Sequence, residues 1–321
     1  MILSLLLFLL SVSSLFSSSP ADLSFEFYSL ACPEVERLVK DAIRTQADLD
    51  PSVPGKLLRL VFHDCMVEGC DGSVLLEGDE SERSDPASAS LGGFSEVEGI
   101  KRLLEVFCPG TVSCADILAL TARDAVEMAG GPSVKIPLGR RDGRVSAVSK
   151  VRINMVDTSF TLDQMAQIFF SKGLSVDDLV TLSGAHTIGV AHCSAFSDRF
   201  KEDSQGKLTP IDPSLDESYA AELTSECPAG ANSSTIVSND PETSLVFDNQ
   251  YYRNLLVGKG LFQSDSELFN DGRTKEKVKL FSDSQESFLQ SWGESFVKLT
   301  AVGVKTGNEG EIRKFCGRVN G

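Results

Sequence analysis

Eight cysteines place the strongest constraint on how this chain folds. All eight follow residues 1–21, MILSLLLFLLSVSSLFSSSPA, a leucine-rich segment without a charged side chain. An apolar run that ends in small residues is typical of a cleaved secretory signal, with an uncleaved anchor as the alternative. Secretion exposes cysteines to an oxidising environment, so we expect disulfides. The spacing leaves their pairing open, although Cys65 and Cys70 are close enough to close a small loop.

Charge and composition exclude several classes of partner. The chain has 321 residues, of which 41% are apolar, enough for a substantial core. Its net charge of -16 argues against binding nucleic acid or anionic lipid. The N-terminal apolar run is short and interrupted by serine, so we expect no membrane span. The acceptor sequence Asn232-Ser233-Ser234 lies in a polar stretch that we expect to be an exposed, glycosylation-competent loop.

The hydrophobic periodicity predicts a mostly α fold. A helix is expected after Cys32-Pro33-Glu34, and another in QESFLQSWGESFVKLTAVG near the C-terminus. Three further helix starts carry capping pairs, and two of these helices end at glycine. The pairs are Ser113 with Asp116, Thr161 with Gln164 and Ser175 with Asp178, and the glycines are Gly130 and Gly173. Two long polar loops, residues 77–96 and 227–244, separate these segments.

The stretch RLVFHDCMVEGCDGS, residues 59–73, combines an apolar helix with an arginine and a histidine. Arg59 and His63 are four residues apart and therefore lie on one helix face. Burying both groups with no carboxylate beside them is costly. The pair should therefore face a cavity, a ligand or a cofactor.

The chain contains only three histidines: His63, His186 and His192. His186 lies in LVTLSGAHTIG, where small neighbours leave room for a flat group. His192 follows six residues later, at about 240° on an ideal helix, and is expected to be structural. A haem pocket would use one histidine as iron ligand and the other, with Arg59, as acid-base pair on the open side. A hydrolase with His63 as base and a zinc site at Cys65, Cys70 and a histidine are alternatives.

The motifs LLRLVFHDCMVEGCDGSVLL and DLVTLSGAHTIG resemble the two signatures of the class III secretory plant peroxidases. The resemblance extends through LSFEFYSLACPEVE, GTVSCADILAL, GGPSVKIPLGRRDG, VFDNQYYRNLL and GEIRKFCGRVN. It thus covers essentially the whole chain after the signal segment. It implies a mostly helical single domain over residues 22–321, with one haem b between a distal and a proximal lobe.

The resemblance also assigns the residues of the haem pocket. Arg59 and His63 match the distal pair that reacts with peroxide, and Phe62 matches the aromatic side chain beside the haem. His186 matches the axial ligand of the haem iron. Asp265, in GLFQSDSELF, matches the carboxylate that accepts the other ring N–H of this ligand.

Two calcium ions per chain are implied in the same way, since hard oxygen donors suit this ion. The distal set consists of Asp64, Val67, Gly69, Asp71 and Ser73. The proximal set consists of Thr187, Asp240, Thr243, Val246 and Asp248. The family's four disulfides would join Cys32 with Cys108, Cys65 with Cys70, Cys114 with Cys316, and Cys193 with Cys227.

Two departures from the family concern the pocket. Glu82 matches the glutamate that supports an asparagine on the distal histidine, but Ser88 stands where that asparagine is expected. The family's LPxP segment reads MVDT, residues 155–158, so both prolines are missing, and Thr158 stands where the family has a proline that contacts the substrate. We expect a more mobile access segment.

The implied function is the reduction of hydrogen peroxide with one-electron oxidation of small phenolic donors. Roles in lignin or suberin formation and in the response to oxidative stress follow from the same resemblance. We expect a secreted monomer in the cell wall, the apoplast or the vacuole. A haem-binding protein with little turnover is the alternative that the two departures favour.

Overall fold

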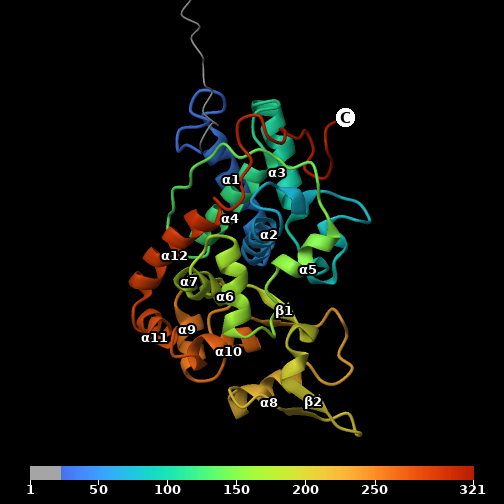
Figure 1. Cartoon of the computed structure of the whole chain (residues 1–321), viewed down its shortest axis with the longest axis vertical. Helices are drawn as coiled ribbons and strands as arrows, with labels where there is room; N and C mark the ends of the chain where they lie inside the picture. Colours follow the sequence, from blue (N-terminus) through green and yellow to red (C-terminus); the bar gives the residue numbers. More distant parts are fainter. Residues whose placement is uncertain (1–22) are drawn as a thin grey trace, which may run out of the picture.

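The computed structural model describes residues 23–321, so the predicted signal segment lies outside the described residues. Helices dominate this part of the chain (Figure 1). The α-helices are α1 (Val35–Leu49), α2 (Val53–Val67), α3 (Phe94–Phe107), α4 (Cys114–Met128), α5 (Val151–Asn154), α6 (Leu162–Ser171), α7 (Val176–Ser183), α8 (Glu217–Glu226), α9 (Gln250–Leu256), α10 (Gln263–Asn270), α11 (Lys275–Asp283) and α12 (Gln285–Leu299). The expected mostly α class is confirmed.

Short 3-10 helices and strands complete the described residues. The 3-10 helices are η1 (Ser73–Leu75), η2 (Glu82–Ser84), η3 (Pro86–Ser88), η4 (Val148–Lys150), η5 (Gly184–Thr187), η6 (Cys193–Ala195) and η7 (Ser197–Arg199). The strands are β1 (Val190–His192), β2 (Phe200–Glu202), β3 (Leu208–Pro210) and β4 (Ile236–Ser238). β1 pairs antiparallel with β4 and β2 with β3. His192 therefore lies on a strand, and its expected position on a helix with His186 is wrong because Gly189 (φ 93°) interrupts the helix.

Side-chain caps start the helices that position the site. Ser113 caps α4 by accepting a hydrogen bond from the backbone N–H of Asp116. Thr161 and Ser175 form the expected capping boxes at α6 and α7, respectively. Such caps satisfy backbone N–H groups that have no partner within the helix. The capping boxes predicted at Thr161 and Ser175 are confirmed, whereas Ser113 caps α4 without the reciprocal bond from the side chain of Asp116.

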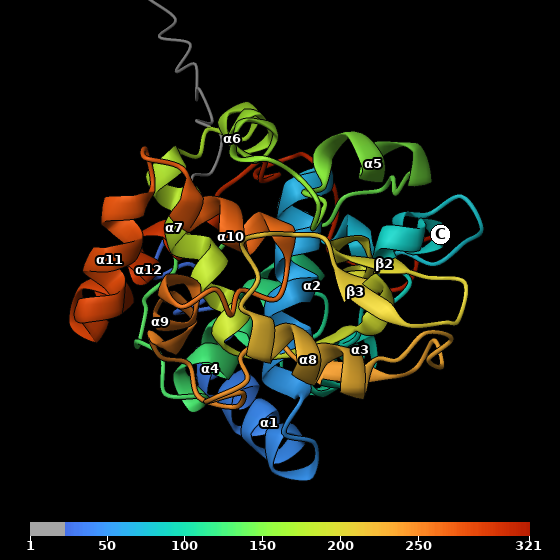
Figure 2. The same ribbon diagram turned by 90° about the horizontal axis from the view of Figure 1, so that it is seen from below.

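One large apolar core joins the helices, with α2 near its centre. α2 packs against α4, and Figures 1 and 2 both show it in the middle of the molecule. The backbones of Gly55 in α2 and Gly189 approach so closely that a Cβ on Gly55 would lie 2.8 Å from Cα of Gly189. A second, smaller apolar cluster lies around α8 and the strands near the edge of the molecule. The α2 residues are therefore held at a fixed place inside the fold.

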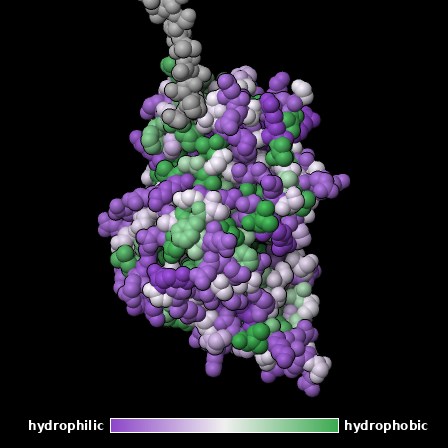
Figure 3. Space-filling view, in the orientation of Figure 1, coloured by the Kyte–Doolittle hydropathy of each residue, from purple (hydrophilic) through white to green (hydrophobic). Residues whose placement is uncertain are grey.

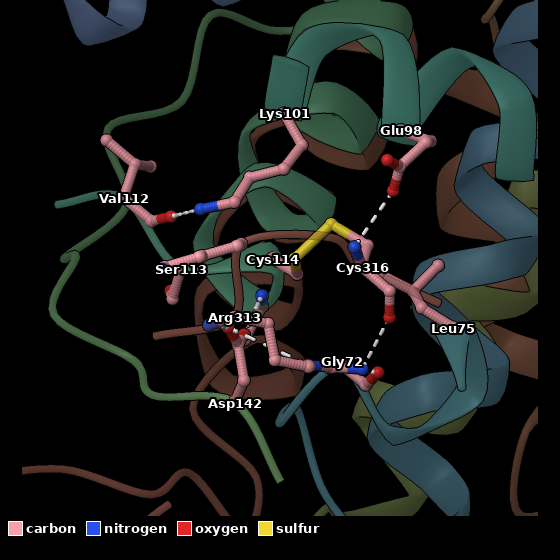
Figure 4. Close-up of a disulfide and its surroundings, with 12 residues drawn as sticks. Gly72, Leu75, Glu98, Lys101, Val112, Ser113, Cys114, Asp142, Arg313 and Cys316 are labelled. Carbon is pink, nitrogen blue, oxygen red and sulfur yellow. Dashed lines mark hydrogen bonds and ion pairs between the residues drawn. A yellow bond between two sulfur atoms is a disulfide. The ribbon is translucent and has the colours of Figure 1, made fainter. Parts of the chain in front are cut away.

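The four expected disulfides are all present. Bonds join Cys32 to Cys108, Cys65 to Cys70, Cys114 to Cys316, and Cys193 to Cys227. Figure 4 shows how the Cys114–Cys316 bond ties the C-terminal segment to α4. The Cys65–Cys70 bond consumes both thiols that the zinc alternative requires, so that alternative is wrong.

The exposed face of the molecule is mostly hydrophilic, with scattered apolar side chains (Figure 3). Asn232 is exposed, in the expected loop before β4. Among residues 23–321, no helix is both long and apolar enough to cross a lipid bilayer.

Candidate functional site

α2 carries the first half of the site. His63 is buried, yet its ring makes no hydrogen bond with any described residue, and its Nδ1 atom is enclosed without a partner. Burial, together with repulsion from the Arg59 guanidinium, lowers the pKa of His63 to about 3. The imidazole is therefore neutral over the physiological range and can accept a proton.

Arg59 is held by the turn that includes η3. Its Nη1 atom donates to Oγ of Ser90 at 2.8 Å, and its Nη2 atom donates to the carbonyl oxygen of Ala87 at 3.2 Å. Phe62 lies between Arg59 and His63 in the sequence. The centroid of its ring is 6.3 Å from that of Phe169 in α6. The hydrogen bonds fix the guanidinium of Arg59, which lies four residues before His63 and therefore on the same face of α2.

Ser88 does not support His63 in the way that the sequence suggested. The hydroxyl oxygen of Ser88 and the Nδ1 atom of His63 are both buried and both lack a hydrogen-bond partner. The two atoms are therefore not hydrogen-bonded to one another. Glu82 is also buried, and one of its carboxylate oxygens is unpartnered while the other accepts from Ser146 at 3.2 Å. Burial raises the pKa of Glu82 to about 7. The orientation of His63 therefore depends on packing alone.

The second half of the site is a hydrogen-bonded chain around Asp265. His186, in η5, places its Nδ1 atom 2.8 Å from Oδ1 of Asp265 at the start of α10. Tyr251 of α9 donates its hydroxyl hydrogen to the same oxygen at 2.8 Å, and the backbone N–H of Phe262 donates to Oδ2 at 2.9 Å. Burial opposes ionisation of Asp265, but these bonds and the attraction of His186 outweigh it and lower the pKa of Asp265.

This arrangement prepares His186 to bind a metal. Because Nδ1 donates to a carboxylate, Nε2 keeps its lone pair, and Nε2 has no partner among the described residues. The side chain remains 39% exposed although the rings of Phe262 and Tyr251 pack edge-on against it. His186 would hold the iron of a haem through Nε2, and His63, whose ring also has no partner among the described residues, would be free to act as a base there.

Tyr251 is a site residue that the sequence reasoning missed. Its motif, VFDNQYYRNLL, was recognised only as a point of resemblance. A buried tyrosine requires a partner for its hydroxyl group, and this one is fully enclosed. The sequence gives no direct signal for this contact, because 14 residues separate Tyr251 from Asp265.

The residues of the predicted proximal calcium set converge beside His186. The hydroxyl of Thr187 lies 3.3 Å from Asp240, 3.2 Å from Asp248 and 3.4 Å from the carbonyl oxygen of Val246. Thr243 approaches the same two carboxylates at 3.4 and 3.2 Å. All of these oxygens lie within 3.4 Å of a threonine hydroxyl, and hard oxygen donors of this kind suit calcium.

The predicted distal set also comes together, although both carboxylate oxygens of Asp64 already have partners. Asp64 accepts from the backbone N–H groups of Gly72 and Val74, at 2.9 and 3.2 Å. Burial and repulsion from Asp71 raise the pKa of Asp64 well above its usual value. The hydroxyl oxygen of Ser73 is buried without a partner. Buried carboxylates this close together need a cation, and Nζ of Lys305 lies 2.7 Å from Oδ2 of Asp71.

Thr158 is more firmly held than the missing prolines suggested. Its hydroxyl group donates to the carbonyl oxygen of Ala195 at 2.8 Å. Its own carbonyl oxygen accepts from the backbone N–H of Ser264, next to Asp265, at 2.8 Å. Hydrogen bonds thus provide part of the restraint that proline rings would supply.

Comparison with known proteins identifies the family. The profile of the family described as Peroxidase matches residues 35–284. The chain belongs to the peroxidase family. Among similar proteins, Peroxidase 18 of Arabidopsis thaliana is 60% identical over 307 residues, which cover 95% of this chain and 93% of the relative. Peroxidase 46 of the same plant is 58% identical over 316 residues, covering 98% and 97%. The similarity to these peroxidases therefore extends over nearly the whole chain and includes both signature motifs.

Proposed function

We propose that this member of the peroxidase family is a secreted haem enzyme that reduces hydrogen peroxide and oxidises small phenolic donors in one-electron steps. The observation that carries the proposal is His186, whose Nδ1 atom is bonded to Asp265 while Nε2 has no partner. The names of the relatives, Peroxidase 18 and Peroxidase 46, agree with this activity.

His186 would bind the iron of one haem b, which supplies redox chemistry at the peroxide oxygens when bound. Asp265 accepts the Nδ1 proton and thereby gives the imidazole more negative character and a fixed orientation. Tyr251 and the backbone of Phe262 hold the carboxylate in place. These contacts keep Nε2 directed at one position.

His63 would transfer the proton of hydrogen peroxide. As a neutral base it accepts a proton from peroxide at Nε2 and returns it to the departing oxygen, which leaves as water. Arg59 stabilises the negative charge that develops while the oxygen–oxygen bond breaks. Its bonds to Ser90 and Ala87 orient the guanidinium in advance.

Two calcium ions would support the two histidines, one at the distal set after α2 and one at the proximal set beside η5.

The disulfides and the apolar N-terminal segment support secretion. Peroxide and a small reducing donor are the partners of the monomer, and lignin or suberin precursors are donors of the proposed phenolic class.

The visible absorption spectrum of the purified enzyme, loaded with haem and calcium, tests the proposal. One equivalent of hydrogen peroxide should shift the Soret band within the mixing time, and a phenol should restore the initial spectrum. A Soret band that does not respond would support the alternative, a haem-binding protein with little turnover. The unpartnered Nδ1 atom of His63 is the observation that favours this alternative.

Two histidine variants sharpen the experiment. His63→Ala should slow the reaction with peroxide by on the order of a hundredfold or more while the haem remains bound. His192→Ala, on β1, is the matched control and should react at the rate of the wild type. Equal rates in the wild type and His63→Ala would exclude His63 as the base.

A further inference from the structure

A cavity of about 490 Å³ lies between the end of η1, the first half of α3 and the C-terminal segment. We call it the C-terminal cavity. Its volume falls within the range of about 300–1,000 Å³ that is typical of small-molecule sites. Among the residues that line it are three arginines and two phenylalanines: Arg83, Arg102, Arg318, Phe94 and Phe315. None of the lining residues belongs to the site described above.

The lining of the C-terminal cavity is positively charged, although the whole chain has a net charge of -16. Two carboxylates, Glu77 and Glu98, face the three arginines, and each of them has an arginine partner. Nη1 of Arg83 lies 3.5 Å from Oε1 of Glu77. Nε of Arg102 lies 3.4 Å from Oε1 of Glu98. Arg318 has no carboxylate partner within residues 23–321, so its guanidinium can receive an anion.

Two guanidinium groups of the cavity are stacked on aromatic rings. Cζ of Arg83 lies 3.8 Å from the centroid of the Phe94 ring. Cζ of Arg318 lies 4.2 Å from the centroid of the Phe315 ring. A guanidinium that rests on a ring keeps its N–H donors in one plane, and its other face can stack on a further planar group. The cavity therefore offers both hydrogen-bond donors and flat stacking surfaces.

The walls of the cavity are held in place without a ligand. The backbone N–H of Glu77 donates to the carbonyl oxygen of Gly317 at 2.9 Å. The backbone N–H of Cys316 donates to Oε2 of Glu98 at 2.8 Å, next to the disulfide of the same cysteine (Figure 4). Both oxygens of Glu98 thus have partners. A ligand that enters such a cavity does not have to order its walls first.

We infer that the C-terminal cavity binds a planar aromatic carboxylate, whose carboxylate group accepts hydrogen bonds from Arg318 and whose ring stacks on the guanidinium of Arg83. A carboxylate can accept two parallel N–H bonds from one guanidinium. An inorganic anion would leave the stacking surfaces unused, and an uncharged aromatic compound would leave Arg318 without a counter-charge. The inference does not depend on the haem chemistry of the proposed function.

Calorimetric titration of the haem-loaded enzyme with trans-cinnamate tests the inference. Cinnamate is planar, carries one carboxylate and has no phenolic hydroxyl group, so the proposed peroxidase reaction does not consume it. The wild type should bind one cinnamate with a dissociation constant of about 0.1–1 mM, which suits a ligand of this size. Cinnamyl alcohol, which has no charge, should bind at least about tenfold more weakly. Cyclohexylpropanoate, which keeps the carboxylate without the planar ring, should also bind more weakly.

Two arginine variants locate the bound cinnamate. Arg318→Gln removes the free guanidinium and should weaken binding at least about tenfold, because hydrogen bonds between charged groups are among the stronger ones. Arg273→Gln removes the same charge between α10 and α11, far from α3 in Figure 1, and should leave the affinity unchanged. Both side chains are exposed, and circular dichroism verifies that each variant is folded. The comparison of cinnamate with cinnamyl alcohol needs no variant.

The Soret band distinguishes the C-terminal cavity from the haem pocket. Cinnamate in the cavity should leave this band unchanged, because no lining residue belongs to the haem pocket. Binding that shifts the Soret band and is equally strong in Arg318→Gln would place cinnamate at the haem and overturn the inference. No measurable binding by the wild type, or equal affinity for cinnamyl alcohol, would overturn it as well. The proposed function is tested separately, by the response to peroxide.

Discussion

The hydroxyl group of Tyr251 lies 2.8 Å from Oδ1 of Asp265, the same oxygen that accepts a hydrogen bond from Nδ1 of His186. One carboxylate oxygen thus serves two donors. The bond from Tyr251 withdraws negative charge from that oxygen and weakens its hold on the His186 proton. Tyr251 therefore moderates the negative character that Asp265 gives to His186.

Substitutions at these two positions should shift the reduction potential of the bound iron in opposite directions. Tyr251→Phe should lower the potential because Asp265 then interacts more strongly with His186. Asp265→Asn should raise it and slow the reaction with peroxide by about ten- to a hundredfold. Spectroelectrochemical titration of the haem-loaded variants measures both potentials. A shift of both in the same direction would contradict the role assigned to Tyr251.

The reaction with peroxide should be insensitive to acid over a wide range. Burial and the charge of Arg59 lower the pKa of His63 to about 3, so His63 remains a neutral base well below neutral pH. We expect the rate constant to be nearly constant between about pH 8 and pH 5 and to fall only towards about pH 3. Rapid-mixing measurements across this range provide the check, and a half-maximal rate near pH 6.5 would show that the site does not depress the pKa.

The same lowered pKa links His63 to stability. Below a pH of about 6.5 the unfolded chain binds a proton at this histidine, whereas the folded chain does not until about pH 3. His63 therefore makes the folded state less stable as the pH falls through that window. His63→Gln should reduce this pH dependence, measured as the urea midpoint at several pH values. If the urea midpoint depends on pH in the same way in the wild type and in His63→Gln, the pKa of His63 is not lowered by folding.

Ser88 should prove dispensable for the reaction with peroxide. Its hydroxyl group forms no hydrogen bond with His63 or with any other described residue. Ser88→Ala should keep the rate within about twofold and should not lower stability, because an unpartnered buried hydroxyl costs free energy. Stopped-flow rates and urea denaturation of the variant test this. A loss of tenfold or more would reveal a contact that forms only when haem is bound.

The sequence predicted the helices and the site motifs well where the signals are local. Capping residues such as Ser113 and Ser175 act within three positions, so their effect is visible in the chain itself. The positions of Arg59 and His63 on one helix follow from the same short-range geometry. The disulfide pairs required the resemblance, because spacing alone cannot choose among pairings.

Contacts between distant segments could not be predicted in this way. The sequence offers no sign that Tyr251 bonds to Asp265 or that Lys305 meets Asp71, 234 residues away by the difference of their numbers. The expected position of His192 was wrong for a related reason. Gly189, at a positive φ, ends the helical segment that the ideal-helix argument extended too far.

A fully buried ion pair should be among the most sensitive positions for stability. Arg140 and Asp116 are both fully enclosed, 2.8 Å apart, and Arg140 also donates to the carbonyl oxygen of Thr300. Arg140→Met would leave the charge of Asp116 without its cation and should cost about 3–5 kcal/mol of unfolding free energy. Arg37→Met, which removes exposed pairs with Glu34 and Asp41, should cost less than about 1 kcal/mol. Urea denaturation measures the free energy of unfolding of both variants. Equal losses of unfolding free energy would contradict the greater importance assigned to the buried pair.

Thr158 offers a test of how the access segment works without its prolines. Its hydroxyl group bonds to Ala195, and its carbonyl oxygen accepts from Ser264, the neighbour of Asp265. Thr158→Ala removes only the first bond and should loosen the segment, since a hydrogen bond contributes about 1 kcal/mol. We expect kcat/KM for a phenol to change severalfold while the rate constant for peroxide stays the same, because His63 and Arg59 are untouched. Ser159→Ala, which removes an exposed hydroxyl bonded only to Asp157, is the matched control. If both variants oxidise the phenol as the wild type does, the donor does not depend on Thr158, and it must approach the site elsewhere.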